Sequence, residues 1–188
     1  MIELREGSML AAVVDGLGHG YESSVAAELA SEVIRAHAEL SVDAILRRCH
    51  EELRITRGAA VGVFKVDAEG AGEFCGIGNI EVQALNGAAP SVFCLAGIVG
   101  HNMRSSKVMR VSMKSGDVYC LMSDGVSTRG NLKSCLPGPP ETVARRIVEH
   151  WGREHDDATA LVLGFGEAEL LAEQSAAPSG GLGRAKVK

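Results

Sequence analysis

Residues 9–20, MLAAVVDGLGHG, decide how this 188-residue chain folds. The apolar run Met9–Val14 is short and is bounded by Gly7-Ser8 and Asp15-Gly16, which is typical of a buried strand. The glycines that follow predict a turn, and apolar residues at helical spacing over 22–40 predict a helix. The stretch therefore predicts a strand that delivers the Asp15 carboxylate at its end, immediately before a turn and a helix.

Two distant segments repeat this pattern. Asp124-Gly125 follows the apolar run 117–122, and Asp156-Asp157 precedes the apolar run 158–165. Asp-Gly alone is ordinary turn sequence, so three unrelated turns remain the alternative. Adjacent carboxylates repel each other unless a positive group holds them, and hard cations such as Mg²⁺ and Mn²⁺ prefer oxygen ligands. Together the segments predict a carboxylate metal site that supports metal-assisted hydrolysis, with a phosphate ester as the expected substrate.

The remaining chain predicts antiparallel sheets covered by helices, an α+β fold. Two further helices are expected, one beginning after Ser41 and one after the proline-rich stretch 137–140. Between them, short apolar runs separated by turn sequences predict an antiparallel meander. Its expected strands are 59–66, 72–77, 81–85, 91–95, 107–113 and 117–122.

Composition excludes several classes of protein. The net charge of −5 comes without a dense Lys/Arg stripe, so we expect no nucleic-acid partner. We expect no membrane partner and no signal peptide, because no apolar stretch approaches the roughly 20 residues of a bilayer span. The five cysteines are widely spaced and form no Cys-x-x-Cys, which indicates buried free thiols and a cytoplasmic location.

The length predicts one domain over residues 1–166. From about Glu167 the composition shifts to Ala, Glu, Ser, Gly and Lys, which is too polar to offset the entropy of ordering. Residues 167–188 are therefore expected to form a mobile tail.

Four motifs in this order resemble the metal-dependent serine/threonine protein phosphatases of the 2C type. They are residues 14–20, Gly76-Ile77-Gly78-Asn79, Ser123-Asp124-Gly125 and Asp156-Asp157-Ala158-Thr159, and the resemblance covers about residues 9–165. Within the family, the Asp-Gly-Leu-Gly turn, Thr56-Arg57-Gly58-Ala59 and the small size look most like the RsbX-type phosphatases that reset the bacterial stressosome. The resemblance implies a four-layer α-β-β-α sandwich, in which two antiparallel sheets are flanked by helices.

The resemblance also implies roles for individual residues. Asp15 would bridge two Mn²⁺ or Mg²⁺ ions, the Gly16 carbonyl would bind one of them, and Asp124 and Asp156 would complete the other. Asp157 would lie beside them as a weaker ligand. The catalytic residues Asp15, Asp124 and Asp156 would act through a metal-bound water that attacks the phosphorus of phosphoserine or phosphothreonine. The implied partners are phosphorylated stressosome scaffold proteins, and the chain is expected to be a monomer or a weak dimer.

The chain departs from the family pattern in two ways. A further acidic ligand, which lies in a Gly-Asp pair upstream in the family, would fall before Met1. Either the chain as given lacks its first strand, or one metal is held by fewer protein groups. The phosphate-binding Arg of larger relatives is also absent. Two alternatives therefore stay open, namely a phosphatase of phosphorylated anti-anti-sigma factors and a pseudophosphatase that binds a partner without turnover.

Several other residues have both a functional and a structural interpretation. His19 in the glycine-rich turn is favoured as structural or solvent-facing over a general acid, and His101 as a loop residue. Gly76 and Gly78 are expected to allow a bulge or a close backbone approach. Arg57 and Arg129 are candidate phosphoprotein contacts, although ordinary solvated arginines are favoured.

Overall fold

The structure of the protein is a computed structural model that describes residues 1–154, 156–166 and 184–186. These residues form two compact units. Unit 1 comprises Met1–Glu81 and Ser91–Ser112, and unit 2 comprises Val82–Pro90 and the described residues from Met113 onward. Because the chain passes from one unit to the other at 81–82, 90–91 and 112–113, the units are not successive segments of the sequence.

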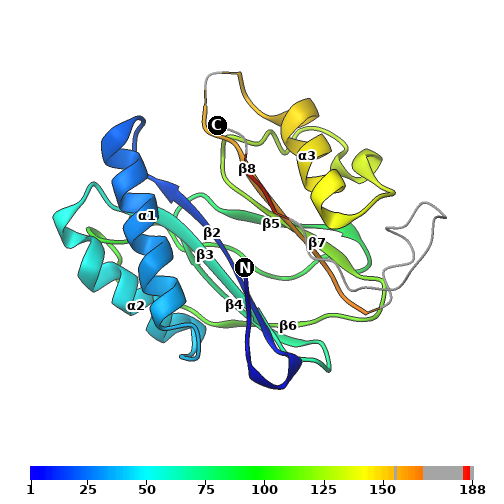
Figure 1. Cartoon of the computed structure of the whole chain (residues 1–188), viewed down its shortest axis with the longest axis horizontal. Helices are drawn as coiled ribbons and strands as arrows, with labels where there is room; N and C mark the ends of the chain where they lie inside the picture. The colour runs from blue at the N-terminus through cyan, green and yellow to red at the C-terminus, as the bar shows by residue number, and fades with distance from the viewer. Residues whose placement is uncertain (155, 167–183, 187–188) are drawn as a thin grey trace. The chain divides into compact units, whose positions relative to one another are not determined.

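Unit 1 is built on a five-stranded sheet with the order β1-β2-β3-β4-β6, in which every neighbouring pair is antiparallel. In chain order, its strands are β1 (Ile2–Glu3), β2 (Met9–Gly16), β3 (Ala59–Val66), β4 (Ala71–Ile77) and β6 (Met109–Ser112). The helices α1 (Tyr21–Ala36) and α2 (Val42–Glu52) lie on one side of the central strands (Figure 1). Short 3₁₀ turns occupy Arg5–Gly7 and Leu53–Ile55.

The core of unit 1 lies between this sheet and its two helices. Leu10, Val61 and Val63 point from β2 and β3 toward the helices, which contribute Ile34, Ile45 and Leu46 among other residues. Each such side chain is at most 4% exposed, so its burial contributes about 1.5–3 kcal/mol to folding. Since side chains alternate along a strand, this packing leaves the odd-numbered residues of β2 on the opposite face of the sheet.

Unit 2 is built on a four-stranded sheet with the order β5-β7-β8-β9. The strands are β5 (Glu81–Asn86), β7 (Val118–Met122), β8 (Thr159–Gly164) and β9 (Arg184–Lys186), and β7, β8 and β9 pair antiparallel. A 3₁₀ turn at Leu132–Cys135 precedes the helix α3 (Pro140–Trp151). Residues Val143, Ala144 and Ile147 of α3 pack on Cys120, Met122, Ala160 and Val162 of the sheet.

The predicted α+β class, with antiparallel sheets covered by helices, is confirmed. The prediction of a single meander is wrong, because β5 joins the sheet of unit 2 while β4 and β6 pair in unit 1. The predicted strand at 91–95 is also wrong. That segment has no strand and forms only a bridge between Leu95 and Ile77. Most of the predicted tail, 167–183 and 187–188, lies outside the described residues.

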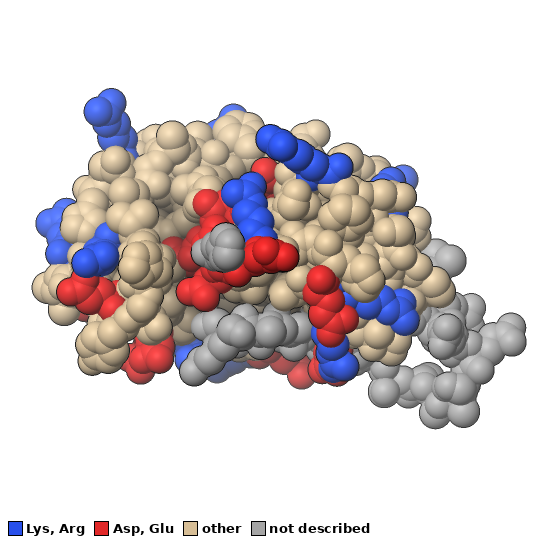
Figure 2. Space-filling model, turned by 90° about the horizontal axis from the view of Figure 1, so that it is seen from above, with Lys and Arg blue, Asp and Glu red and all other residues tan. Residues whose placement is uncertain are grey.

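The surface carries both signs of charge. On the face of the molecule shown in Figure 2, Lys and Arg side chains stand in small separate groups, with Asp and Glu side chains between several of them. No helix among the described residues is long and apolar enough to cross a bilayer.

Candidate metal site

Asp15 is the second-last residue of β2 and is still paired with the neighbouring strand. It stands opposite Ala60 of β3, and Gly16 stands opposite Ala59. The side chain is half-buried and shares its face of the sheet with Ala11 and Val13, on the side away from α1 and α2. Pairing on β3 therefore fixes the backbone that carries this carboxylate.

Gly16 can be no other residue without local rearrangement. A Cβ at this position would lie 2.1 Å from the carbonyl oxygen of Ser23, in the first turns of α1. The Ser23 hydroxyl donates a hydrogen bond of 2.9 Å to the Gly16 carbonyl. A carbonyl oxygen has two lone pairs, so this bond orients the Gly16 carbonyl and still leaves it an acceptor position for a cation.

The glycine-rich turn after Gly16 is held from a second side. The Leu17 backbone N–H donates to the Gly58 carbonyl over 2.9 Å, which extends the pairing of β2 and β3 by one residue. Gly18 and Gly20 have φ values of +87° and +78°, which residues other than glycine rarely adopt. His19 is exposed between them, as the solvent-facing interpretation predicts.

In unit 2, Ser123 joins the two acidic segments. Its backbone N–H donates to the Thr159 carbonyl over 3.0 Å, and its hydroxyl accepts from the Thr159 N–H over 3.1 Å. The same hydroxyl lies 3.4 Å from the Asp157 carbonyl, to which it donates. The residue directly before Asp124 therefore holds the end of β7 against the start of β8. Sequence reasoning gave Ser123 no role of its own, although its position before Asp-Gly was the available signal.

Gly125 allows the closest approach of these two segments. A Cβ there would lie 2.3 Å from the Asp157 carbonyl oxygen, and the Gly125 carbonyl accepts a 2.8 Å bond from the Arg153 N–H. The Asp156 carboxylate accepts from the Asp157 N–H over 3.0 Å. Asp124, Asp156 and Asp157 are all exposed. Unit 2 thus brings the backbone segments that carry these three acids next to each other, on exposed loops.

The chemistry of these donors fits a hard divalent cation. Asp15 and Gly16 in unit 1 and Asp124, Asp156 and Asp157 in unit 2 offer carboxylate and carbonyl oxygens, the ligands that Mg²⁺ and Mn²⁺ prefer. Within the part of the chain that the structure describes, no group of three His, Cys, Asp or Glu side chains is placed to hold a metal ion.

The cysteines do not supply a nucleophile. All five are free, and burial is the main cause that raises the pKa of each. The pKa is raised to about 12 for Cys49, Cys94 and Cys120 and to about 11 for Cys75. Near neutral pH these groups are thiols rather than thiolates. The predicted free thiols agree with the structure, and all are buried except Cys94, which is half-buried.

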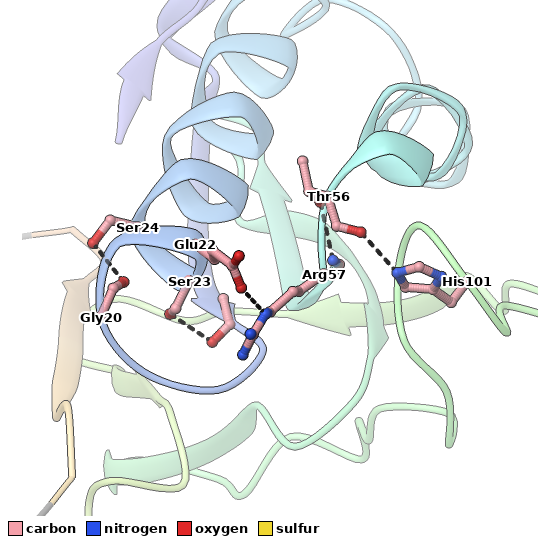
Figure 3. A network of polar contacts seen from close by, with 9 residues as sticks. Gly20, Glu22, Ser23, Ser24, Thr56, Arg57 and His101 are labelled. Carbon is pink, nitrogen blue, oxygen red and sulfur yellow. Dashed lines mark hydrogen bonds and ion pairs between the residues drawn. The ribbon is translucent and has the colours of Figure 1, made fainter.

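The other predicted residues have structural surroundings. A Cβ at Gly76 would lie 2.3 Å from the Cys94 sulfur, and one at Gly78 would lie 2.5 Å from the Ala60 Cβ, so both glycines permit a close approach. His101 bonds through Nε2 to the Thr56 carbonyl over 2.9 Å (Figure 3). Arg129 is exposed, whereas Arg57 forms an ion pair with Glu22.

Comparison with known proteins adds independent information. No family model matches the chain. The curated phosphoserine phosphatase RsbX of Bacillus subtilis is 23% identical over 131 residues, which are 66% of this chain and 66% of that relative. The alignment therefore spans just under two thirds of the length of RsbX.

Solved structures share the fold. A chain from work on the bacterial stressosome, described as a modular system adapted to control secondary messenger signalling, is 29% identical over 86% of this chain and 88% of that one, with a TM-score of 0.72. The crystal structure of RsbX in complex with magnesium is 19% identical over 82% and 80%, with a TM-score of 0.71.

The serine/threonine phosphatase PstP of Mycobacterium tuberculosis also shares the fold, with 15% identity, a TM-score of 0.67 and coverage of 89% of this chain and 95% of that one. The sequence similarity to RsbX and the fold shared with both phosphatases agree with the resemblance that the ordered Asp-Gly motifs indicate. The chain is therefore similar in sequence to the phosphoserine phosphatase RsbX and has the fold of RsbX and of the serine/threonine phosphatase PstP.

Proposed function

We propose that this chain is a metal-dependent phosphatase of phosphoserine and phosphothreonine in stressosome scaffold proteins. The observation that carries the proposal is the connection made by Ser123, which ties the loop of Asp124 to the segment of Asp156 and Asp157. This connection keeps the backbone segments of three exposed acids next to each other, and neighbouring carboxylates repel each other unless a positive group is bound between them.

The proposed ligands are Asp15, the Gly16 carbonyl, Asp124 and Asp156, with Asp157 beside them, and the proposed cofactor is a pair of Mn²⁺ or Mg²⁺ ions. Bound divalent ions of this kind acidify water and stabilise the charge of a phosphoryl group under attack. The protein's own contribution is orientation. Pairing of β2 with β3 fixes Asp15, and the Ser23 hydroxyl orients the Gly16 carbonyl. The exposed loops of unit 2 leave Asp124 and Asp156 accessible to a phosphate carried by another protein.

The nature of the substrate is supported by the relatives. RsbX is named a phosphoserine phosphatase, and a similar chain comes from work on the stressosome. We expect the protein to act in the cytoplasm, because its five unpaired thiols suit a reducing compartment, and to be a monomer or a weak dimer.

Metal-dependent turnover tests the enzymatic part. We expect the purified protein to hydrolyse para-nitrophenyl phosphate with Mn²⁺ or Mg²⁺ and to stop in EDTA. Asp15→Asn and Asp124→Asn should remove the activity. Asp67→Asn is the matched control, because Asp67 caps a surface turn by accepting bonds from the Glu69 and Ala71 N–H groups. Folded protein without any metal-dependent turnover would contradict the proposal and support the pseudophosphatase.

Calorimetric titration with Mn²⁺ tests the ligands separately from turnover. Loss of binding in both Asp15→Asn and Asp124→Asn, with binding retained in Asp67→Asn, supports a shared site. Unchanged binding in either acidic variant would remove that residue from the ligand set.

The substrate is tested by competition. Phosphorylated stressosome scaffold protein and phosphorylated anti-anti-sigma factor are offered with Mn²⁺, and release of phosphate is followed for each. A higher kcat/KM for the scaffold protein supports the proposal, and a higher value for the anti-anti-sigma factor supports the alternative.

A further inference from the structure

We propose that Arg57 binds the phosphate group of the phosphoprotein substrate and that Glu22 is the partner it leaves on binding. This inference rests on the proposed phosphatase function and adds a residue to it. Arg57 lies in the segment between the 3₁₀ turn Leu53–Ile55 and β3, and its guanidinium forms an ion pair with Glu22 in the first turn of α1 (Figure 3).

The pairing of β2 with β3 places the segment of Arg57 next to the glycine-rich turn that follows Asp15 and Gly16. Gly16 pairs with Ala59, and the bond from the Leu17 N–H to the Gly58 carbonyl continues the pairing by one residue. Arg57 is the residue before Gly58, and Gly18 is the residue after Leu17. A Cβ built on Gly18 would lie 3.1 Å from a terminal nitrogen of Arg57, so the guanidinium lies over the glycine-rich turn.

The backbone that carries Arg57 is fixed by its neighbours. The Thr56 hydroxyl donates to the Leu53 carbonyl over 2.8 Å and accepts from the Gly58 N–H over 3.0 Å. His101 Nε2 bonds the Thr56 carbonyl over 2.9 Å. Gly58 has φ +80°, and a Cβ there would lie 2.5 Å from the Val99 carbonyl. Only the side chain of Arg57 is therefore left free to change its partner.

The ion pair with Glu22 is of the kind that a phosphate displaces. The side chains of Arg57 and Glu22 are 54% and 61% exposed, and exposed ion pairs contribute little to stability. A phosphate dianion offers more charge than one carboxylate and accepts two parallel bonds from a guanidinium. The interaction of Arg57 with the substrate phosphate is therefore expected to be stronger than the ion pair with Glu22 that it replaces.

The surroundings of Arg57 suit a polypeptide substrate. Three large apolar side chains next to it in sequence or in the same turns are exposed, namely Leu17, Tyr21 and Ile55. Leu17 belongs to the turn beneath the guanidinium, Tyr21 precedes Glu22, and Ile55 lies two residues before Arg57. Exposed apolar side chains rimmed by polar groups are typical of protein-binding surfaces, so we infer that these three contact the substrate polypeptide. The occupant that fits is a phosphorylated protein segment with apolar residues beside its phosphoserine.

Steady-state kinetics with a phosphoserine peptide test the inference. We expect Arg57→Gln to raise KM about 10-fold, with a smaller change in kcat, and Arg57→Lys to retain part of the affinity because it keeps the charge. Glu22→Gln should lower KM, because the competing carboxylate is gone. Arg48→Gln is the matched control, since Arg48 pairs with Glu51 on α2 at 55% and 57% exposure. A KM for Arg57→Gln within twofold of that for Arg48→Gln would overturn the inference.

Binding without turnover separates this inference from the proposed function. Fluorescence anisotropy in EDTA compares the phosphoserine peptide with the same peptide carrying serine. We expect the wild-type protein to prefer the phosphorylated peptide and Arg57→Gln to lose that preference. Equal binding of the phosphopeptide by both proteins would overturn the role of Arg57 even if turnover is metal-dependent. Absence of turnover with the preference intact would instead overturn the phosphatase and leave Arg57 as a phosphate-binding residue.

Discussion

The predicted metal ligands of the two units are held in different ways. In unit 1, Asp15 is part of a paired strand, and the group that fixes the next carbonyl, Ser23, is only seven residues away. In unit 2, Asp124 and Asp157 stand on exposed loops, and Ser123 joins their segments across 34 and 36 residues of sequence. A predicted ligand can thus be positioned by backbone pairing within a sheet or by a side-chain contact between distant segments. We expect a single substitution to disrupt the side-chain contact more easily than the backbone pairing.

The largest expected effect is on catalysis and comes from the strand-held carboxylate. Loss of a group that supports a metal ligand typically lowers activity about 10–100-fold. Asp15→Asn should lower kcat by more than this, because the paired strand β2 cannot shift to bring another oxygen ligand to the position of the Asp15 carboxylate. Asp157→Asn, on a loop beside the other acids, should cost about 10-fold. Para-nitrophenyl phosphate assays with Mn²⁺ measure both, with Asp67→Asn as control. An effect of Asp157→Asn equal to that of Asp15→Asn would break the distinction between strand and loop.

The next effect is on stability, at the glycines of the two junctions. Gly16→Ala and Gly125→Ala place a Cβ against a backbone carbonyl oxygen, at 2.1 Å from that of Ser23 and 2.3 Å from that of Asp157. We expect each to lower the free energy of unfolding in urea by about 3 kcal/mol. Gly20→Ala is the control for backbone strain without a clash, because nothing lies within 4 Å of its Cβ, and it should cost about 1 kcal/mol. Equal losses at all three glycines would show that the contacts with Ser23 and Asp157 do not matter.

A smaller effect is expected at the serine that joins the loops. Ser123→Ala removes the acceptor of the Thr159 N–H and should lower the free energy of unfolding by about 1–2 kcal/mol. It should also weaken Mn²⁺ binding about 10-fold, because the loop of Asp124 loses its support. Ser134→Ala, which removes an exposed bond to Asn131, is the control and should change neither value. Tight Mn²⁺ binding by Ser123→Ala would mean that the loops of unit 2 hold their position without this contact.

The smallest effect is a dependence of stability on alkaline pH. Burial raises the pKa of Cys49 and Cys120 to about 12 in the folded protein, above the ordinary thiol value of 9.0. The folded protein therefore holds these protons more tightly, so stability is complete below pH 9 and falls as the pH rises toward 12. Between pH 8 and 9 the loss should be about 0.3 kcal/mol for each thiol. Urea unfolding of Cys49→Ala in unit 1 and Cys120→Ala in unit 2 measures each contribution, and an unchanged pH slope in both would contradict it.

Local patterns in the sequence predicted the elements well where the determining contacts are also local. Residues 9–20 are an example, because the apolar run, the carboxylate and the glycines lie within one strand and its turn. The predicted strand at 91–95 was wrong because an apolar run indicates that a segment can form a strand, but not that a neighbouring strand is available to pair with it. Only Leu95 finds one there, next to Gly76 and Gly78.

The assignment of β5 to the second sheet was missed for the same reason, since two sheets offer edges to any short strand. In the candidate site, the acids were visible as Asp-Gly and Asp-Asp, whereas Ser123 and the pair of Arg57 with Glu22 were not. Their roles depend on residues brought together from distant parts of the sequence.

The three passages of the chain between the units have a consequence for synthesis on the ribosome. β5 leaves the exit tunnel well before β7, its neighbour in the sheet, and the first sheet lacks its edge strand until Met109–Ser112 has emerged. The first segment of unit 2, Val82–Pro90, therefore emerges before unit 1 is complete, and it must wait for Met113 and later residues to pair. Truncation between residues 82 and 108 should therefore yield an aggregation-prone fragment, because it removes the edge strand β6 of the first sheet.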